Sequence, residues 1–401
     1  MRILLLVDCY LPSIKASAKL VHDLAVEFHR LGHETIVAAP DDTLLMPTRV
    51  SYEDGVTVLR IRSGRIKGAP KIIRGLNEAS LSLILWRRGR RFFQDRPCDL
   101  VIYYSPSIFF GTLVRKLKKL LGCQSYLILR DIFPQWAVDA GILRKNLIYR
   151  FFRYKEMQQY AAADIIGVQS PKNLRYFSEN GLSRYRLEVL YNWMSLSEQN
   201  VSQSNYRKML GLEGKVVFFY GGNIGEAQDM DNILRLVKRM RHEQNVHFLI
   251  VGEGSQTTRL TAQINANQLR NITVHGAIGQ QEYLAMLSEF DVGLITLNRN
   301  LKTQNFPGKM LGYMYHAMPI LASINPGNDL KEILEEHNAG LVCLNGEDDL
   351  FYKYAFQLAE DLDLRRKIGQ NGRALLENTF SVPRAAQQVL SHFEIRDTSR
   401  F

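Results

Sequence analysis

The chain has 401 residues, of which 46% are hydrophobic and 23% are charged. These proportions are typical of a soluble globular protein and exclude a collagen-like, disordered or small disulfide-stabilised chain. No apolar run approaches the roughly 18 to 20 residues that a membrane-spanning helix needs. The first apolar run, Ile3–Val7, is followed by Asp8 and by no small-residue cleavage site, so we expect a buried strand there and not a signal peptide.

The formal net charge is +11, from 51 Lys and Arg against 40 Asp and Glu. This balance favours an anionic partner, which could be nucleic acid, acidic lipid or a phosphorylated substrate. The four cysteines are scattered and form no C-x-x-C pair. Their spacing therefore predicts neither a metal site nor a disulfide framework, and it fits a reducing compartment such as the cytoplasm.

Short β-branched runs alternate with longer amphipathic stretches along the chain. In chain order, the predicted strands are Ile3–Val7, Glu34–Ala39, Val56–Ile61, Leu100–Tyr104, Ser125–Leu129, Ile165–Gln169, Leu187–Leu190, Lys215–Tyr220, Val246–Val251, Ile272–His275, Val292–Thr296, Pro319–Ser323 and Gly340–Leu344. Several are apolar almost throughout, which is typical of strands buried on both faces of a parallel sheet. The alternation predicts βαβ units and an α/β fold.

This number of strands is too large for a single sheet. We therefore expect two doubly wound, Rossmann-like parallel-sheet domains that face each other across a cleft. The polar stretch 195–205 marks the expected boundary. We therefore expect an N-terminal domain over 1–195, a second domain over 196–378, and a C-terminal helix within 379–401 that returns to the first domain.

Glycine-rich turns distinguish the two halves. The turn after the first strand, Asp8–Ala16, has no glycine, which argues against an N-terminal dinucleotide site. The first turn of the second half, Gly221–Gly225, follows an apolar run and precedes a helix, and Gly252 and Gly254 close the next strand. Such turns let backbone N–H groups approach a phosphate, although a plain strand-to-helix turn is the alternative interpretation.

A basic segment over 60–96 holds eleven Lys and Arg against two acids, with Trp86 and two phenylalanines among them. A basic amphipathic segment with aromatic residues suits an anionic membrane surface. The alternative is a solvated helix face whose apolar side belongs to the core. Nucleic acid is disfavoured as a partner because no recognition module is visible.

Several motifs resemble those of a known family, the retaining GT-B glycosyltransferases of the glycogen-synthase-like type (family four). In the second half these are Gly221–Gly225, Asn305–Met314, Pro319–Ser323 and Pro326–Asp329, and in the first half Leu129–Pro134 and Tyr191–Trp193. The resemblance spans essentially the whole chain. Within the family it is strongest to WbuB-like N-acetyl-L-fucosaminyl transferases of bacterial O-antigen and capsule synthesis.

The resemblance implies transfer of a hexose from a UDP-sugar, used as co-substrate without a metal or other cofactor, to a polyprenyl-diphosphate-linked sugar. It also implies an enzyme peripheral to the inner face of the cytoplasmic membrane, on anionic lipid. The implied donor-binding residues are Gly221, Gly222, Asn223, Ile224, Gly225, Gly252, Gly254, Gln304, Asn305, Phe306, Pro307, Gly308 and Gly312. The Arg and Lys pair that the family carries after the glycine loop is missing from 226–232, so we expect Lys309 to hold the diphosphate as a catalytic residue. We expect Asp131, or else Arg130, to orient the acceptor hydroxyl, and a helix N-cap is the alternative role of Asp131.

Besides lacking the Arg and Lys pair after the glycine loop, the sequence departs from the family at two positions. Gln304 and Gly312 stand where the family usually carries two glutamates that contact the donor sugar and the ribose. Two other functions therefore stay open. One is a nonhydrolysing UDP-sugar epimerase, although no Asp, Glu and His constellation suits it. The other is a non-catalytic basic adaptor on a degenerate transferase fold.

Overall fold

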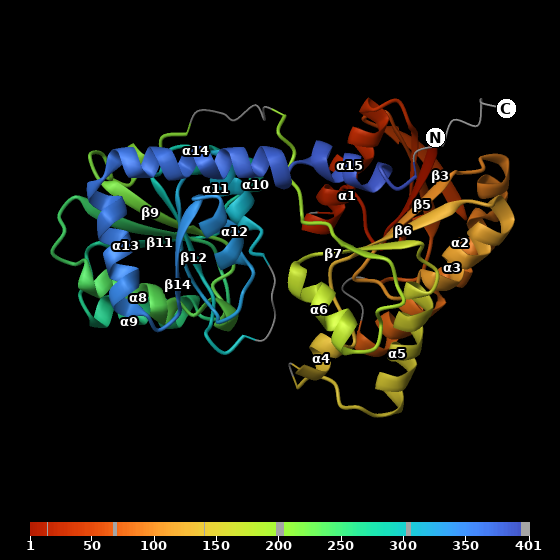
Figure 1. Cartoon of the computed structure of the whole chain (residues 1–401), viewed down its shortest axis with the longest axis horizontal. Coiled ribbons are helices and arrows are strands. Elements are labelled where there is room, and N and C mark those ends of the chain that lie inside the picture. Colours follow the sequence, from red (N-terminus) through yellow and green to blue (C-terminus); the bar gives the residue numbers. More distant parts are fainter. Residues whose placement is uncertain (14, 67–69, 140, 198–203, 302–305, 394–401) are drawn as a thin grey trace. The chain divides into compact units, whose positions relative to one another are not determined.

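The computed structural model describes residues 1–13, 15–66, 70–139, 141–197, 204–301 and 306–393 (Figure 1). The chain divides into two compact units. Unit 1 comprises Met1–Ser195 and the C-terminal segment that begins at Val382, and unit 2 comprises Leu196–Ser381. The last helix of unit 2 ends at Thr379, so the expected limit at residue 378 falls inside the final turn of that helix.

Unit 1 is built on one eight-stranded sheet. Its strands are β1 (Arg2–Leu6), β2 (Glu34–Asp41), β3 (Thr48–Glu53), β4 (Val56–Arg62), β5 (Leu100–Tyr104), β6 (Gln124–Leu129), β7 (Ile165–Val168) and β8 (Leu187–Val189). Its helices are α1 (Ala16–Arg30), α2 (Lys71–Asp95), α3 (Gly111–Leu121), α4 (Gln135–Asp139), α5 (Leu147–Tyr160), α6 (Pro171–Glu179) and α15 (Val382–Leu390). The strand order is β3-β4-β2-β1-β5-β6-β7-β8, and every pair is parallel except β3 with β4.

The side chains of β1 alternate between two cores, one on each face of this sheet. Ile3 and Leu5 belong to a cluster that contains residues of α1 and α15, whereas Leu4 and Leu6 belong to a cluster with residues of α2, α3 and α6. Successive side chains of a strand point to opposite faces, so a strand with two buried faces must be apolar throughout. This requirement explains the uninterrupted Leu-Leu-Leu of the first strand.

The basic segment 60–96 lies mainly in β4 and α2. Leu81, Leu85 and Phe93 are buried in the core of unit 1, and Trp86 is half-buried with the guanidinium of Arg90 5.6 Å from its ring centroid. The apolar side of the C-terminal half of α2 therefore packs inward, which matches the alternative of a charged helix face over a core. Lys67 lies outside the described residues.

Unit 2 is built on a six-stranded, wholly parallel sheet in the order β11-β10-β9-β12-β13-β14. Its strands are β9 (Val216–Gly221), β10 (Val246–Val251), β11 (Ile272–His275), β12 (Val292–Thr296), β13 (Ile320–Ile324) and β14 (Gly340–Leu344). Its α-helices are α7 (Tyr206–Met209), α8 (Met230–Arg239), α9 (Thr257–Ala266), α10 (Gln280–Leu287), α11 (Lys309–Tyr315), α12 (Leu330–Glu336), α13 (Asp348–Glu360) and α14 (Leu362–Thr379), and a short 3-10 helix spans Glu226–Gln228.

Each sheet has one switch point, where the strand order reverses direction. In unit 1 it lies between β1 and β5, and in unit 2 between β9 and β12. Ligands of doubly wound sheets bind beyond the carboxyl ends of the strands at such points. The predicted α/β fold with two doubly wound sheets is confirmed, and no helix among the described residues is long and apolar enough to cross a membrane.

Candidate functional site

The turn after β9 lies at the switch point of unit 2, but most of its backbone donors are already used. The N–H of Gly221 donates to the hydroxyl of Tyr313 (3.2 Å), that of Gly222 to the carbonyl of Val251 (2.9 Å), and that of Ile224 to the carbonyl of Glu253 (3.0 Å). No described residue accepts from the N–H of Asn223 or Gly225. Of the backbone N–H groups in the turn Gly221–Gly225, only these two are available to a ligand within the described chain.

The glycines of the second turn are needed for close backbone packing. A Cβ on Gly252 would lie 1.9 Å from the carbonyl oxygen of Gly222, and a Cβ on Gly254 would lie 2.2 Å from that of Ile224. Gly252 also has φ +150°, a conformation that side chains disfavour. The two glycine turns therefore interlock through their backbones, and Gly252 and Gly254 shape the site whether or not they touch a ligand.

Lys309 brings a positive charge to this turn. Its Nζ lies 3.4 Å from the centroid of the Tyr220 ring, and it would be the nearest atom, at 3.5 Å, to a Cβ on Gly222. Lys309 is half-buried, and no described carboxylate pairs with it. Burial lowers the pKa of its ammonium group well below the usual value. An unpaired cation beside two available N–H groups is a place where an anion gains electrostatic stabilisation.

The rest of the predicted donor segment supports α11. Phe306 is buried, with its ring centroid 6.2 Å from that of Phe380, and the carbonyl oxygens of Pro307 and Gly308 accept from the N–H groups of Met310 and Leu311. Gln304 and Asn305 lie outside the described residues. Phe306, Pro307 and Gly308 therefore begin the helix that carries Lys309.

Gly312 lies inside α11 and is buried. A Cβ there would be 3.1 Å from Cδ1 of Leu287 in α10. A side chain at this position would require Leu287 to shift by a few tenths of an ångström, so Gly312 allows close packing of α11 against α10. Nearby, the Tyr313 hydroxyl donates to the carbonyl of Leu294 (3.2 Å) while it accepts from Gly221, and it thus ties α11 to the end of β9 and to the middle of β12.

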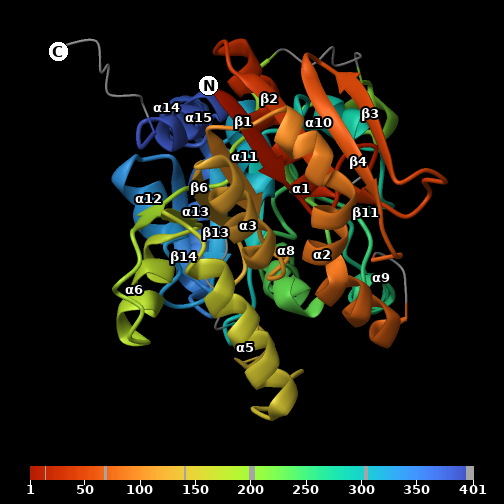
Figure 2. The same ribbon diagram turned by 90° about the vertical axis from the view of Figure 1, so that its right-hand side faces the viewer.

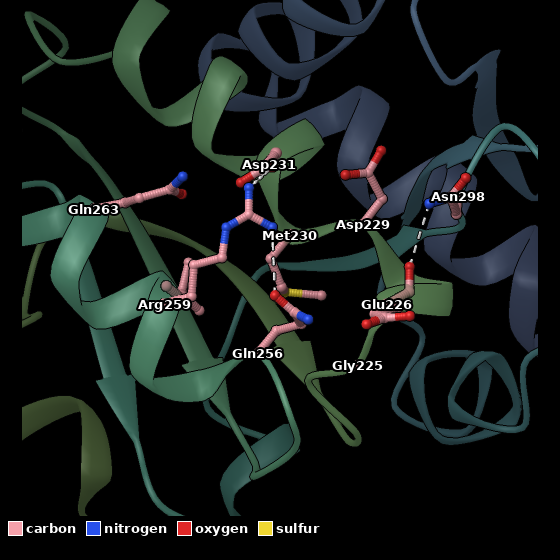
Figure 3. Close-up of a pocket in the computed structure, with 10 residues that line it drawn as sticks. Gly225, Glu226, Asp229, Met230, Asp231, Gln256, Arg259, Gln263 and Asn298 are labelled. Atoms are coloured by element: carbon pink, nitrogen blue, oxygen red, sulfur yellow. Dashed lines mark hydrogen bonds and ion pairs between the residues drawn. The ribbon is translucent and has the colours of Figure 1, made fainter.

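A pocket of about 310 Å³ opens on the other side of Gly225 (Figure 3). Among the described lining residues there are three acids, Glu226, Asp229 and Asp231, and one cation, Arg259. The guanidinium of Arg259 is paired with Asp231 (2.5 Å), and Asp229 accepts from Asn345 (2.8 Å). This acidic pocket suits a diphosphate less well than the Lys309 side of the turn. The sequence reasoning identified neither Arg259 nor Asn298, because no motif marks them.

Unit 1 has a small pocket at its own switch point. It has a volume of about 160 Å³ and receives Asp8 after β1, Pro106–Phe109 after β5 and Asp131 after β6. Aromatic side chains form its apolar wall, namely Phe109, Phe133, Trp136 and Phe152. The carboxyl ends of three neighbouring strands thus bring two carboxylates to one partly apolar cavity.

Asp131 is an unusual carboxylate in this pocket. No described residue donates to its side chain, so Asp131 is not an N-cap of the helix that follows. Burial raises the pKa of Asp131 even though the adjacent Arg130 acts in the opposite direction. A carboxylate with a raised pKa in a cavity is well suited to accept a hydrogen bond, or a proton, from a ligand hydroxyl.

The side chain of Arg130 binds other residues of unit 1. Its guanidinium donates to the carbonyls of Leu190 and Tyr191, the latter at 3.4 Å, and lies 5.3 Å from the ring centroid of Trp193. Burial lowers the pKa of Arg130. These contacts fix the segment after β8 against the sheet. They assign Arg130 a positioning role, in contrast to Asp131.

A second, larger pocket of unit 1 was not predicted. It has a volume of about 630 Å³ and lies beyond β1, β2 and β4. Its charged and hydroxyl-bearing lining comprises Asp8, Tyr10, Ser13, Asp41, Asp42, Thr43, Arg49, Ser51, Glu53, Arg60 and Ser63. Alternating acceptors and donors of this kind suit a ligand with many hydroxyl groups.

Two family models match the chain, one in each unit. The model "Glycosyl transferase 4-like domain" matches residues 16–193, and "Glycosyl transferases group 1" matches residues 202–375. Solved structures agree in fold. Sucrose-phosphate synthase from Thermosynechococcus elongatus has a TM-score of 0.70 at 15% identity, with 98% of each chain covered. HepE of Anabaena in complex with UDP and glucose has a TM-score of 0.67 at 15% identity, with 98% and 99% covered.

Two named glycosyltransferases are similar in sequence to part of the chain. The chain is 26% identical over 269 residues to the "probable glycosyltransferase WbjE" of Pseudomonas aeruginosa, with 66% of each protein covered. It is 25% identical over 262 residues to WcaI of Escherichia coli, which is named for colanic acid biosynthesis, with 62% of this chain and 63% of that protein covered. The aligned stretch thus spans slightly less than two thirds of these relatives. From the matches in both units, the chain belongs to the glycosyltransferases with a GT-B fold, and its unit 2 is a glycosyl transferases group 1 domain.

Proposed function

We propose that the chain transfers a sugar from a UDP-sugar to a lipid-linked, polyprenyl-diphosphate-bound sugar in the synthesis of a bacterial surface polysaccharide. Unit 2 binds the donor and unit 1 binds the acceptor. The names of WbjE and WcaI support a role in polysaccharide synthesis, and the UDP bound to HepE supports a uridine nucleotide. N-acetyl-L-fucosamine is the sugar we propose, on the resemblance to WbuB-like enzymes.

The observation that carries this proposal is the position of Lys309. Its ammonium group lies beside Gly222 at the switch point of unit 2, without a carboxylate partner among the described residues. A bound diphosphate would supply the missing negative charge. Two N–H groups, those of Asn223 and Gly225, are available to share it. Because these donors are fixed before the reaction, they would stabilise the charge that develops on the leaving group.

The proposed reaction exchanges one bond at the anomeric carbon for another. The bond from C1 to the β-phosphate oxygen breaks, and UDP leaves with the electron pair. The acceptor hydroxyl oxygen forms the new bond to C1 from the same face, so that the configuration is retained. Its proton passes to the departing phosphate oxygen. Asp131 would orient this hydroxyl by accepting its hydrogen bond before the proton moves.

The test is nucleotide binding by the wild-type chain and the variant Lys309→Met, without metal and with EDTA. A ligand at about 100 times its dissociation constant stabilises the protein by about 2.7 kcal/mol, which a thermal-shift assay detects. We expect UDP to stabilise the wild type more than GDP or ADP does. Loss of a charge-assisted hydrogen bond should weaken UDP binding by about 10- to 100-fold in Lys309→Met.

The control is Lys238→Met, which removes an exposed lysine of α8 and should leave UDP binding unchanged. A pH series adds a second readout. Because the pKa of Lys309 is lowered, its ammonium group loses its proton below the usual lysine range. Wild-type affinity for UDP should therefore fall as the pH rises, at pH values below those at which an ordinary lysine loses its proton, and the affinity of Lys309→Met should change less. Equal UDP binding by both lysine variants, or none by the wild type, would overturn the proposal.

A further inference from the structure

Helix α5 presents apolar side chains to solvent. Leu147, Phe151 and Tyr154 follow one another at i, i+4 and i+7, and they are 79%, 43% and 59% exposed. Residues at this spacing share one face of a helix. Ile148 lies on the flank of the same face and is 56% exposed. Figure 2 shows α5 projecting from one end of unit 1.

The opposite face of α5 packs normally. Glu156, Gln159 and Tyr160 are buried, and the Tyr160 hydroxyl donates to Glu156 (2.7 Å) inside the unit. The helix thus has two distinct faces. One packs into the core of unit 1, and the other is apolar and exposed to solvent. Isolated exposed apolar residues need no explanation, but a continuous apolar face marks an interaction surface.

The same segment is strongly basic. Residues 141–155 hold five cations, Arg144, Lys145, Arg150, Arg153 and Lys155, and no acid. Arg153 pairs with the buried Glu156 (2.6 Å). Arg144, Lys145 and Arg150 are exposed, and the ammonium of Lys155 lies 5.8 Å from the ring centroids of both Phe151 and Tyr154. Cations therefore flank the apolar face instead of interrupting it.

An aromatic cluster connects this face with the pocket that holds Asp131. The ring of Phe151 lies 5.7 Å from that of Phe152 and 6.5 Å from that of Phe109, as measured between centroids. Phe152 and Phe109 line the Asp131 pocket, and so does Trp136, which is itself 39% exposed. The exposed face and the proposed acceptor pocket are therefore connected by one aromatic cluster.

We propose that this surface, made of Trp136, Ile142 and the exposed face of α5 and called here the α5 surface, docks on an anionic phospholipid bilayer. An amphipathic helix with aromatic residues on one side and cations at its edges lies in the interface of such a bilayer, with the apolar face in the acyl boundary and the cations at the phosphates. A second copy of this chain is a poor occupant, because its own cations would face these. The role of this surface rests on the proposed function: a protein docked in this way would receive a lipid-linked acceptor from the bilayer beside Asp131.

The experiment measures vesicle binding by the full chain. Vesicles of phosphatidylcholine alone are compared with vesicles that contain roughly 30% phosphatidylglycerol. We expect binding to the anionic vesicles only, and a loss of about tenfold or more in Leu147→Gln/Phe151→Gln. These positions are exposed, so the variant should fold. Brominated lipid should quench the fluorescence of the wild type, and Trp136→Phe should remove most of that quenching.

A matched pair of charge variants locates the surface. Arg144→Gln/Lys145→Gln and Arg87→Gln/Arg91→Gln each remove two exposed cations, so they change the net charge equally. The first pair should weaken vesicle binding by about tenfold or more, and the second, on α2, by less than about twofold. Equal losses in the two pairs, no binding by the wild type, or a dimer that Leu147→Gln/Phe151→Gln dissociates would overturn the inference. UDP-induced stabilisation, measured on the same samples, reports separately whether the proposed function holds.

Discussion

Lys309 in unit 2 and Asp131 in unit 1 carry side chains of opposite charge, and burial disfavours the charged form of each. It lowers the pKa of Lys309 and raises that of Asp131, so that each group is shifted toward its neutral form. Burial of a charge is costly unless a partner offsets it. In the proposed reaction, the diphosphate would offset the charge of Lys309, and the acceptor hydroxyl would solvate that of Asp131. Each substrate would thus relieve a cost that the folded chain already carries.

At the scale of the residue, this reasoning predicts the effect of Asp131→Asn. A carboxyl group whose pKa is higher in the folded than in the unfolded chain costs stability at high pH, and the cost disappears once the pH falls below its ordinary range near 3.9. Asp131→Asn should therefore raise the unfolding midpoint near pH 8, by an amount that shrinks as the pH falls. It should also lower the turnover number by roughly 100-fold.

Thermal unfolding across pH and single-turnover transfer measure the two effects. Asp95→Asn, at an exposed position of α2, is the control and should change neither. A lower midpoint for Asp131→Asn near pH 8 would mean that the carboxylate stabilises the fold and is not held unpaired in the pocket.

At the scale of the element, the two glycine turns of unit 2 interlock through their backbones. Gly252→Ala would place a methyl group 1.9 Å from the carbonyl oxygen of Gly222 and force φ +150° on a residue with a side chain. Strain and overpacking together should cost about 3 kcal/mol or more. Because the Gly222 turn must move, UDP-induced stabilisation should also fall. Chemical denaturation and the UDP thermal shift check both expectations.

Gly276→Ala is the matched substitution for this experiment. It follows β11 in the same sheet, and no atom lies within 4 Å of the Cβ it would create. It should change the free energy of unfolding by less than about 1 kcal/mol. If the two variants were equally stable, the close approach of the turns would be contradicted.

The elements also show what the sequence could predict. Strands buried on both faces, such as β5 and β10, stand out because they are apolar throughout, and from them followed the confirmed α/β fold. The strand β3 was missed because none of its residues is buried and because, within the described sheet, it lies at the edge and pairs with β4 alone. Helix α5 shows a second feature that the sequence alone could not predict, namely which of its apolar residues are exposed. Its run of Leu, Ile, Tyr and Phe suggests a core helix, and only the packing of the unit shows which of its faces stays outside.

The candidate site was predictable to a similar degree. A glycine turn after an apolar strand indicates a ligand edge, and the resemblance then pointed to Lys309. The sequence could not show that Gly221, Gly222 and Ile224 use their N–H groups inside the protein, because their partners lie in other elements. Nor could it show that the carboxylate of Asp131 has no partner among the described residues, since its burial depends on aromatic residues from three separate segments.

At the scale of the whole molecule, the chain passes between its units twice. Unit 2 is one continuous segment, whereas unit 1 is completed by α15 from the end of the chain. Ala386, Val389 and Leu390 of α15 are buried in the same cluster as Val21 and Leu24 of α1. Unit 1 therefore depends on residues that follow unit 2 in the sequence, whereas the described core cluster of unit 2 contains no residue of α15.

This dependence predicts that a charge in α15 damages one unit selectively. Val389→Asp would bury a carboxylate in the core of unit 1 and should destabilise that unit by about 3 kcal/mol or more. The stabilisation of unit 2 by UDP should persist, because the proposed donor site and its core lie wholly within 196–381. Denaturation followed by two probes would separate the units: the fluorescence of the three tryptophans, Trp86, Trp136 and Trp193, all in unit 1, and UDP binding for unit 2. Gln387→Asp, two residues earlier and exposed, adds the same charge to solvent and should leave both probes unchanged. If Val389→Asp removed UDP binding before the tryptophan signal changed, the donor site would depend on unit 1, and its assignment to unit 2 alone would be wrong.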